Sequence, residues 1–241
     1  MKTLLQEKGI TNWKTLKGLT VVGIFLLLTT TACQSTEPFK VKDTVIKDTN
    51  LHEVVNARVY VAYIDPDVDF SRYKRILVRP LNFDKVKIEE NYDSPRNVEF
   101  ELNEKDKAML DGIYQDMMLK YLQEKGDFQV VKSPGADVLT LSVFVLQIRP
   151  NAPKDDFKSR GSGRGVTVYS EGAGSITIAA SVNDSMSGKT VAQVADSKAS
   201  TSMWGINNRV SNTQDVSIIF GQWAQQLNNA LKSLQTYKIE R

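Results

Sequence analysis

The chain has 241 residues, of which 41% are apolar and 24% are charged, and its formal net charge is +3. This composition is ordinary for a globular protein and excludes a mainly disordered chain. The length suffices for one domain or at most two small ones.

The first 32 residues have the layout of an export signal. They contain four lysines and one acidic residue, Glu7, and then a run of ten uncharged residues, 19–28, which is followed by small residues. Since this run has about half the length that a membrane-spanning helix needs, we interpret residues 1–32 as a cleaved signal. The alternative is a short buried helix or a membrane anchor, and the cysteine at the end of the small residues argues against it.

The segment Thr30-Thr31-Ala32-Cys33 resembles the lipobox of bacterial lipoproteins, although that family prefers Leu where Thr30 stands. The resemblance implies that a diacylglycerol is attached to the sulfur of Cys33, that the chain is cut before this residue, and that the lipid holds the protein at a membrane. Two or three acyl chains anchor firmly, because each buried methylene contributes roughly 0.8 kcal/mol. Gln34 implies the periplasmic side of the outer membrane, since the family's sorting rules associate Asp at this position with the inner membrane.

Cleavage also changes the charge. The signal removes 4 of the 31 basic residues and 1 of the 28 acidic ones, which leaves 27 of each and a net charge of zero. We therefore expect no nucleic-acid partner. With its one cysteine lipidated, the chain has no thiol for a disulfide, a metal site or catalysis.

The domain organisation follows from composition. Residues 34–56 are rich in Lys, Asp and Thr and show no sustained periodicity, so we expect a lipidated cysteine and flexible tether over 33–56. A single periplasmic domain is expected over 57–241.

Two amphipathic helices are predicted in this domain. The first follows Asn103, which can cap it, and ends before Gly126. The second carries an apolar stripe from Val216 to Leu234. Its candidate caps are Ser211, Thr213 and Asp215.

Several strands lie between and before the helices, and short turns between consecutive strands favour antiparallel pairing. The segment 138–148 is apolar on both faces, which predicts a central strand, and 175–182 alternates cleanly before a turn and a return strand. We predict an α+β fold, a two-layer sandwich in which two amphipathic helices pack on a mostly antiparallel sheet. The expected strands are 58–63, 73–80, 128–131, 138–148, 175–182 and 190–202.

The order of several segments resembles an uncharacterised family of Gram-negative lipoproteins that is described as a domain of unknown function. This resemblance spans about residues 57–235. It implies a periplasmic lipoprotein and no known activity. The segments are Tyr73–Pro80, the helix after Asn103, Ser133–Leu139, Val182–Lys189 and Trp223-Ala224.

Motifs for catalysis and metal binding are weak, so we expect no catalytic residue, no metal and no cofactor. The one histidine, His52, lies in the predicted tether, which excludes a catalytic triad and a histidine zinc site. The serine–lysine pattern 71–74 lacks the further motifs of penicillin-recognising enzymes. The acidic segment 65–69 fits a turn better than a calcium loop.

The segment 151–174 is a long excursion between two strands, and such loops are usually functional or disordered. It is a candidate binding loop for a glycan, a lipid head group or an acidic protein, and a solvated hairpin tip is the favoured alternative. Its candidate contact residues are Lys154, Phe157, Lys158, Arg160, Arg164 and Tyr169.

The sequence thus predicts a membrane-anchored, non-catalytic binding or accessory factor of the cell envelope, with an envelope protein or a glycan as its partner. One alternative is a cell-wall or lipid hydrolase that uses carboxylates alone, for which Asp155 and Asp156 are adjacent but weak candidates. The other alternative is a purely structural lipoprotein.

Overall fold

Alternating apolar residues build the centre of the sheet. In β9 (Gly174–Asp184) every second residue is buried, as the period of two predicts. A turn containing Gly188, at a φ of +71°, returns the chain to β10 (Thr190–Ala199), which pairs with β9 antiparallel. On its other side β9 pairs antiparallel with β7 (Val138–Pro150). The predicted hairpin and the predicted central strand are both confirmed.

The computed structural model describes residues 40–89, 102–150, 169–171, 174–200, 204–206, 209–236 and 239. All of them belong to one of the two units into which the chain divides, Glu37–Arg241. The predicted signal and Cys33 lie outside the described residues.

The main sheet has nine strands in the order β1-β2-β3-β10-β9-β7-β4-β6, with β5 also paired to β7. Pairing is antiparallel except around β4 and β5: β4 is parallel to both β6 and β7, and β5 is parallel to β7. A separate antiparallel pair is formed by β8 (Tyr169–Glu171) and β11 (Trp204–Ile206). The remaining strands are β1 (Val41–Val45), β2 (His52–Val54), β3 (Val61–Ile64), β4 (Arg75–Val78), β5 (Lys87–Ile88) and β6 (Gln129–Val131).

Helix α1 (Glu104–Met118) begins where the sequence predicts. The Asn103 side chain accepts a hydrogen bond from the Asp106 amide, and the Asp106 side chain accepts one from the Asn103 amide, which is a reciprocal capping box. The helix continues as a π-helical segment, η2 (Leu119–Glu124).

Helix α2 (Arg209–Thr236) begins earlier than predicted. Ser211, Thr213 and Asp215 therefore lie inside the helix and none of them is its cap. Asp215 is buried within the helix. The short 3-10 helix η1 (Phe70–Arg72) precedes β4.

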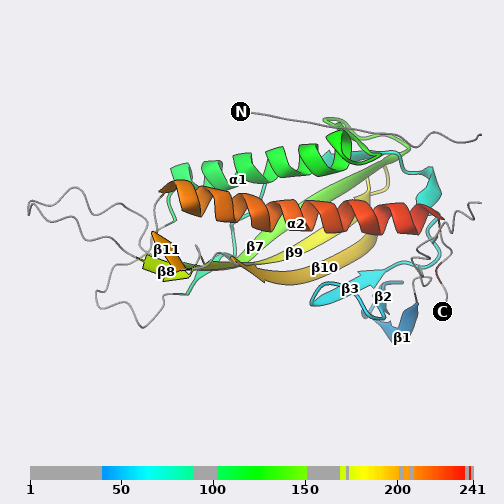
Figure 1. Cartoon of the computed structure of the whole chain (residues 1–241). Helices are drawn as coiled ribbons and strands as arrows, with labels where there is room; N and C mark the ends of the chain where they lie inside the picture. Colours follow the sequence, from blue (N-terminus) through cyan, green and yellow to red (C-terminus); the bar gives the residue numbers. More distant parts are fainter. Residues whose placement is uncertain are drawn as a thin grey trace, which may run out of the picture. The chain divides into compact units, whose positions relative to one another are not determined.

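Both helices cover the same face of the sheet, side by side (Figure 1). The predicted apolar stripes face the sheet and form the core, in which Tyr114, Phe220 and Trp223 make consecutive aromatic contacts. The two-layer α+β sandwich is confirmed. Among the described residues, no helix has the length and the apolar character that a membrane crossing requires.

The prediction of a flexible tether over residues 33–56 is wrong from residue 40 onward. Residues 41–45 form the edge strand β1 and residues 52–54 form its neighbour β2, and Val41, Leu51 and Val54 are buried. His52 lies in β2, where its Nδ1 is 3.1 Å from the Lys42 carbonyl oxygen. Because four of the five residues of β1 are exposed, this edge strand shows no alternation of apolar and polar residues. The domain therefore begins before Ala57.

Candidate functional site

The helices leave one face of the sheet uncovered by either of them, and we call it the open face. Side chains on this face come from the positions between the buried ones, such as Ala179 and Ser181 in β9. Phe144 of β7 also points to this side and is 38% exposed. The alternation along the strands predicts this separation of the two faces.

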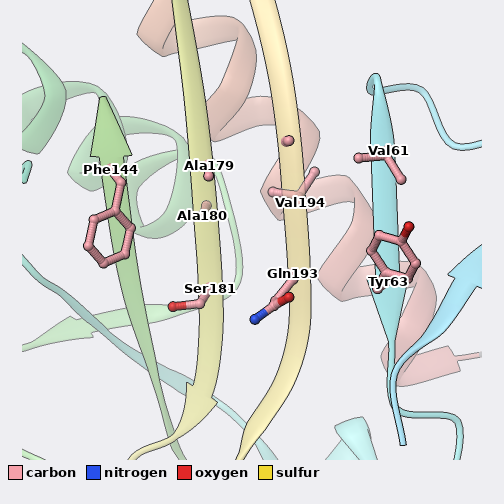
Figure 2. A pocket seen from close by; sticks show the side chains of 9 residues that line it. Val61, Tyr63, Phe144, Ala179, Ala180, Ser181, Gln193 and Val194 are labelled. Carbon is pink, nitrogen blue, oxygen red and sulfur yellow. The ribbon is translucent and has the colours of Figure 1, made fainter. Parts of the chain in front are cut away.

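The open face contains a shallow hollow of about 330 Å³ across β7, β9, β10 and β3. We call it the open-face hollow. Its floor consists of small residues, Ala179, Ser181 and Ala195, and the aromatic rings of Phe144 and Tyr63 stand at its two sides (Figure 2). Large side chains on the outer strands and mainly small ones between them, with Gln193 as the exception, therefore produce the concave shape.

Strand register arranges the lining in two parallel rows. The first row runs Phe144–Ala179–Ala195–Val61. The second row runs Ser142–Ser181–Gln193–Tyr63, and of these Ser142 lies beside the hollow and does not line it. Each row crosses four strands, so the two rings lie at opposite ends of adjacent rows, on strands that are about 14 Å apart across three strand spacings.

None of the described residues that line the hollow is charged. Its polar groups are neutral, namely a serine hydroxyl, the Gln193 amide and the Tyr63 hydroxyl. Farther out, Glu53 is the register partner of Tyr63 and forms an ion pair with Lys42. At the other end of the face Arg149 forms an ion pair with Glu89. Each of these two flanking ion pairs is therefore neutral as a whole.

The serine–lysine pattern 71–74 serves the structure. The Ser71 hydroxyl donates to Asp69 at 2.6 Å, while Arg72 forms an ion pair with Asp184 and the Tyr73 hydroxyl donates to the same carboxylate at 2.8 Å. Burial, followed by the hydrogen bond to Asp184, raises the pKa of Tyr73. These contacts tie η1 to the end of β9.

The acidic segment 65–69 is a turn, as the sequence predicts. The buried Asp65 accepts hydrogen bonds from the Asn50 amide group at 2.6 Å and from the Asp67 backbone amide at 3.0 Å. Lys189 lies 2.6 Å from its second oxygen. Burial acts to raise the pKa of Asp65, but Lys189 and the hydrogen bonds outweigh it and lower the pKa. Lys189 thus occupies the side of the Asp65 carboxylate where a metal cation would bind. Among the described residues, no group of three or more His, Cys, Asp or Glu side chains could hold a metal ion.

The predicted binding loop lies mostly outside the described residues. This holds for Lys154, Phe157, Lys158, Arg160 and Arg164, and also for Asp155 and Asp156. The backbone of Tyr169 begins β8. The loop therefore remains a prediction.

Sequence reasoning predicted that the strand 138–148, which contains Phe144, is apolar on both faces, but it did not identify the hollow. The hollow depends on which residues of β3, β9 and β10 lie beside Phe144, and that register is a long-range property. A detectable signal was the set of small residues at the outward positions of 175–182.

The comparisons with known proteins agree with the predicted resemblance to an uncharacterised family. The model of a family described as proteins of unknown function (DUF3313) matches residues 43–227. Among curated proteins, none matches the chain.

Several solved structures are similar at low identity. Protein XCC0632 from Xanthomonas campestris is 15% identical, with a TM-score of 0.41 over 68% of this chain and 86% of that chain. The PelC dodecamer from Paraburkholderia phytofirmans is 10% identical, with a TM-score of 0.35 over 65% and 90%. A minor lipoprotein from Acinetobacter baumannii is 14% identical, with a TM-score of 0.32 over 68% and 98%.

Proposed function

We propose that this chain, which belongs to the DUF3313 family of proteins of unknown function, is a lipid-anchored binding protein of the bacterial envelope. It holds its partner at the open-face hollow and carries out no chemistry on it. The membrane is the outer membrane, and the domain faces the periplasm.

The anchor rests on Cys33 and the residues before it. A basic start, a short apolar run and Thr30-Thr31-Ala32-Cys33 occur in the order that lipoprotein export requires. Acyl chains on one sulfur and on the new amino terminus supply the membrane affinity that a single chain lacks.

The observation that carries the binding role is the open-face hollow itself. Concave surfaces with apolar and aromatic linings and a few polar groups are the usual form of ligand sites. The lining offers two aromatic rings, small apolar residues and neutral polar groups. No Asp or Glu is among its described lining residues, so this site supports binding rather than the carboxylate hydrolysis considered above.

The anchor is tested with Cys33→Ser in the full chain. We expect an uncleaved precursor that incorporates no labelled palmitate, because the sulfur that accepts the diacylglycerol is gone. The matched control Ser35→Ala leaves Cys33 in place and remains lipidated. Palmitate in the Cys33→Ser protein, or an intact amino-terminal methionine in the wild type, contradicts the anchor.

The binding role is tested with a photo-crosslinking residue in intact cells. One variant carries it at Gln193, in the hollow, and the control carries it at Ile218, which is exposed on α2. We expect a discrete crosslinked product from position 193 that is absent from position 218. Identical products at both positions, or none at 193, contradict binding at the hollow.

A further inference from the structure

We infer that the ligand of the open-face hollow is a neutral saccharide chain that lies across the strands. This inference rests on the proposed function, because it specifies the partner of the same site. Three properties of the hollow carry it: its lack of charge, the placement of its two rings, and its neutral polar groups.

The lack of charge excludes a ligand whose recognition depends on ionic groups. A carboxylate or phosphate that enters the hollow loses water and meets no cation among the described lining residues. Lys42 and Arg149, which belong to the same sheet, are already paired with Glu53 and Glu89. Charge complementarity therefore points to an uncharged ligand.

The two rings act as platforms for stacking. Figure 2 looks onto the open face with the helices behind the strands, and the faces of the Phe144 and Tyr63 rings are turned to the viewer. The C–H-bearing face of a pyranose packs on such a ring face. Because the strands that carry the two rings are about 14 Å apart, one sugar cannot reach both rings, so the ligand is a chain of several units.

The neutral polar groups select a saccharide over an acyl chain. The Ser181 hydroxyl and the Gln193 amide lie between the two rings and each can both donate and accept hydrogen bonds. Sugar hydroxyls do the same and can satisfy them. An acyl chain would cover these groups without a partner, which is unfavourable.

The test measures binding to the full chain by isothermal titration calorimetry, in a detergent without sugar head groups. The neutral probes are chitotetraose and maltotetraose, and the charged probe is a hyaluronan tetrasaccharide. We expect at least one neutral probe to bind about tenfold or more tightly than the charged one. Phe144→Ala should weaken that binding by about tenfold, as loss of a central aromatic contact does.

Two further variants show whether weaker binding comes from a change in the hollow or from a general loss of folding. Gln193→Ala changes only an exposed residue of the hollow and should also weaken the neutral probe. Met186→Ala alters a residue that is 68% exposed in the hairpin turn and should leave binding unchanged. If Met186→Ala weakens binding of the neutral probe as much as Gln193→Ala does, the assignment of the ligand to the hollow is overturned.

The remaining outcomes distinguish this inference from the proposed function. If no neutral probe binds while the crosslink from position 193 persists, the saccharide is overturned and the binding role stands. If no neutral probe binds and position 193 gives no crosslink, the saccharide ligand and the binding role are both contradicted. If sedimentation shows a dimer that Phe144→Ala dissociates and no saccharide binds, a second copy is the occupant and the saccharide is overturned.

Discussion

Asp184 lies at the end of β9, and five hydrogen bonds converge on its buried carboxylate. They come from Arg72, from the Tyr73 hydroxyl, from the Met186 amide, and from both the amide and the hydroxyl of Ser187. Burial acts to raise the pKa of Asp184, but hydrogen bonds from Ser187 and Tyr73 outweigh it and hold the pKa well below its usual range. This carboxylate therefore joins the hairpin turn to η1.

The lowered pKa predicts a dependence of stability on pH. A carboxylate whose pKa is lower in the folded chain stabilises it fully above the unfolded value of about 3.9, and this contribution is lost as the pH falls through the folded value. Asp184→Asn should reduce the free energy of unfolding by about 2–3 kcal/mol at pH 7. Urea unfolding at pH 7, 5 and 3 should show this difference shrinking at pH 3. The exposed Asp116→Asn is the control, and a constant difference for Asp184→Asn contradicts the pKa assignment.

The indole of Trp223 joins α2 to the sheet. Its Nε1 donates to the buried Asp196 at 2.8 Å, and the same carboxylate accepts from the Tyr60 amide at 3.1 Å. Lys198 lies 3.3 Å away. Removing the donor leaves a buried acceptor without its hydrogen bond, which lowers the stability of the folded chain.

Trp223→Phe should therefore lower the free energy of unfolding by about 2–4 kcal/mol, from the lost donor and the lost volume. Chemical denaturation measures this value. Asp196→Asn keeps an acceptor oxygen, and the double variant should lose less than the sum of the single ones. Strict additivity would show that the two side chains do not interact energetically.

At the scale of elements, periodicity predicts the parts whose two faces differ strongly. Helix α1, helix α2 and the β9–β10 hairpin each bury one face against the core, so their patterns are visible in the sequence. The parallel pairing of β4 is not visible, because it depends on strands more than 50 residues away in the chain. The strands β1 and β2 pair with each other locally, but β1 is mostly exposed and shows no alternation that would identify it. The start of α2 was also missed, since polar residues occupy its first turns.

The end of the first helix depends on close approach of its backbone to α2. A Cβ on Gly126 would lie 2.4 Å from the Leu122 carbonyl oxygen and 2.5 Å from the Asn228 side chain. Neither distance is sterically allowed, and the carbonyl belongs to the π-helical segment itself. Gly126 therefore permits the chain to turn away after η2.

Two glycines of this region should respond to alanine in opposite ways. Gly126→Ala should lower the melting temperature, with a loss of about 2 kcal/mol or more from forced displacement of backbone. Gly112→Ala, in the exposed middle of α1 with nothing within 4 Å of its Cβ, should stabilise the chain by up to about 1 kcal/mol. Calorimetry of both variants measures the two changes in stability. If Gly112→Ala destabilises the chain as much as Gly126→Ala does, the close approach at Gly126 is not the cause.

For the whole molecule, the candidate site is a product of topology. Phe144 and Ala195 are 51 positions apart in the sequence, and they enter one row because β7, β9 and β10 are adjacent and in register. The sequence predicts which residues face away from the helices, but it does not predict which of them are neighbours. The fold class could therefore be predicted, whereas the hollow required the structure.

The extent of the domain leads to the last prediction. Leu51 is 2% exposed and belongs to a region that sequence composition assigns to a tether. Because this side chain is buried, Leu51→Ala should lower the free energy of unfolding by about 2–4 kcal/mol, as large-to-small changes in a core do.

The matched control is Val45→Ala in β1, whose side chain is 41% exposed and whose loss should change the unfolding free energy by about 0.5 kcal/mol or less. Urea unfolding of the two variants compares a buried position with an exposed one in the same β1–β2 unit. Equal and negligible effects would mean that residues 40–56 do not contribute to the folded domain. A large effect at Leu51 alone means that the sheet, and with it the strand β3 that carries Tyr63, is completed by residues close to the proposed anchor.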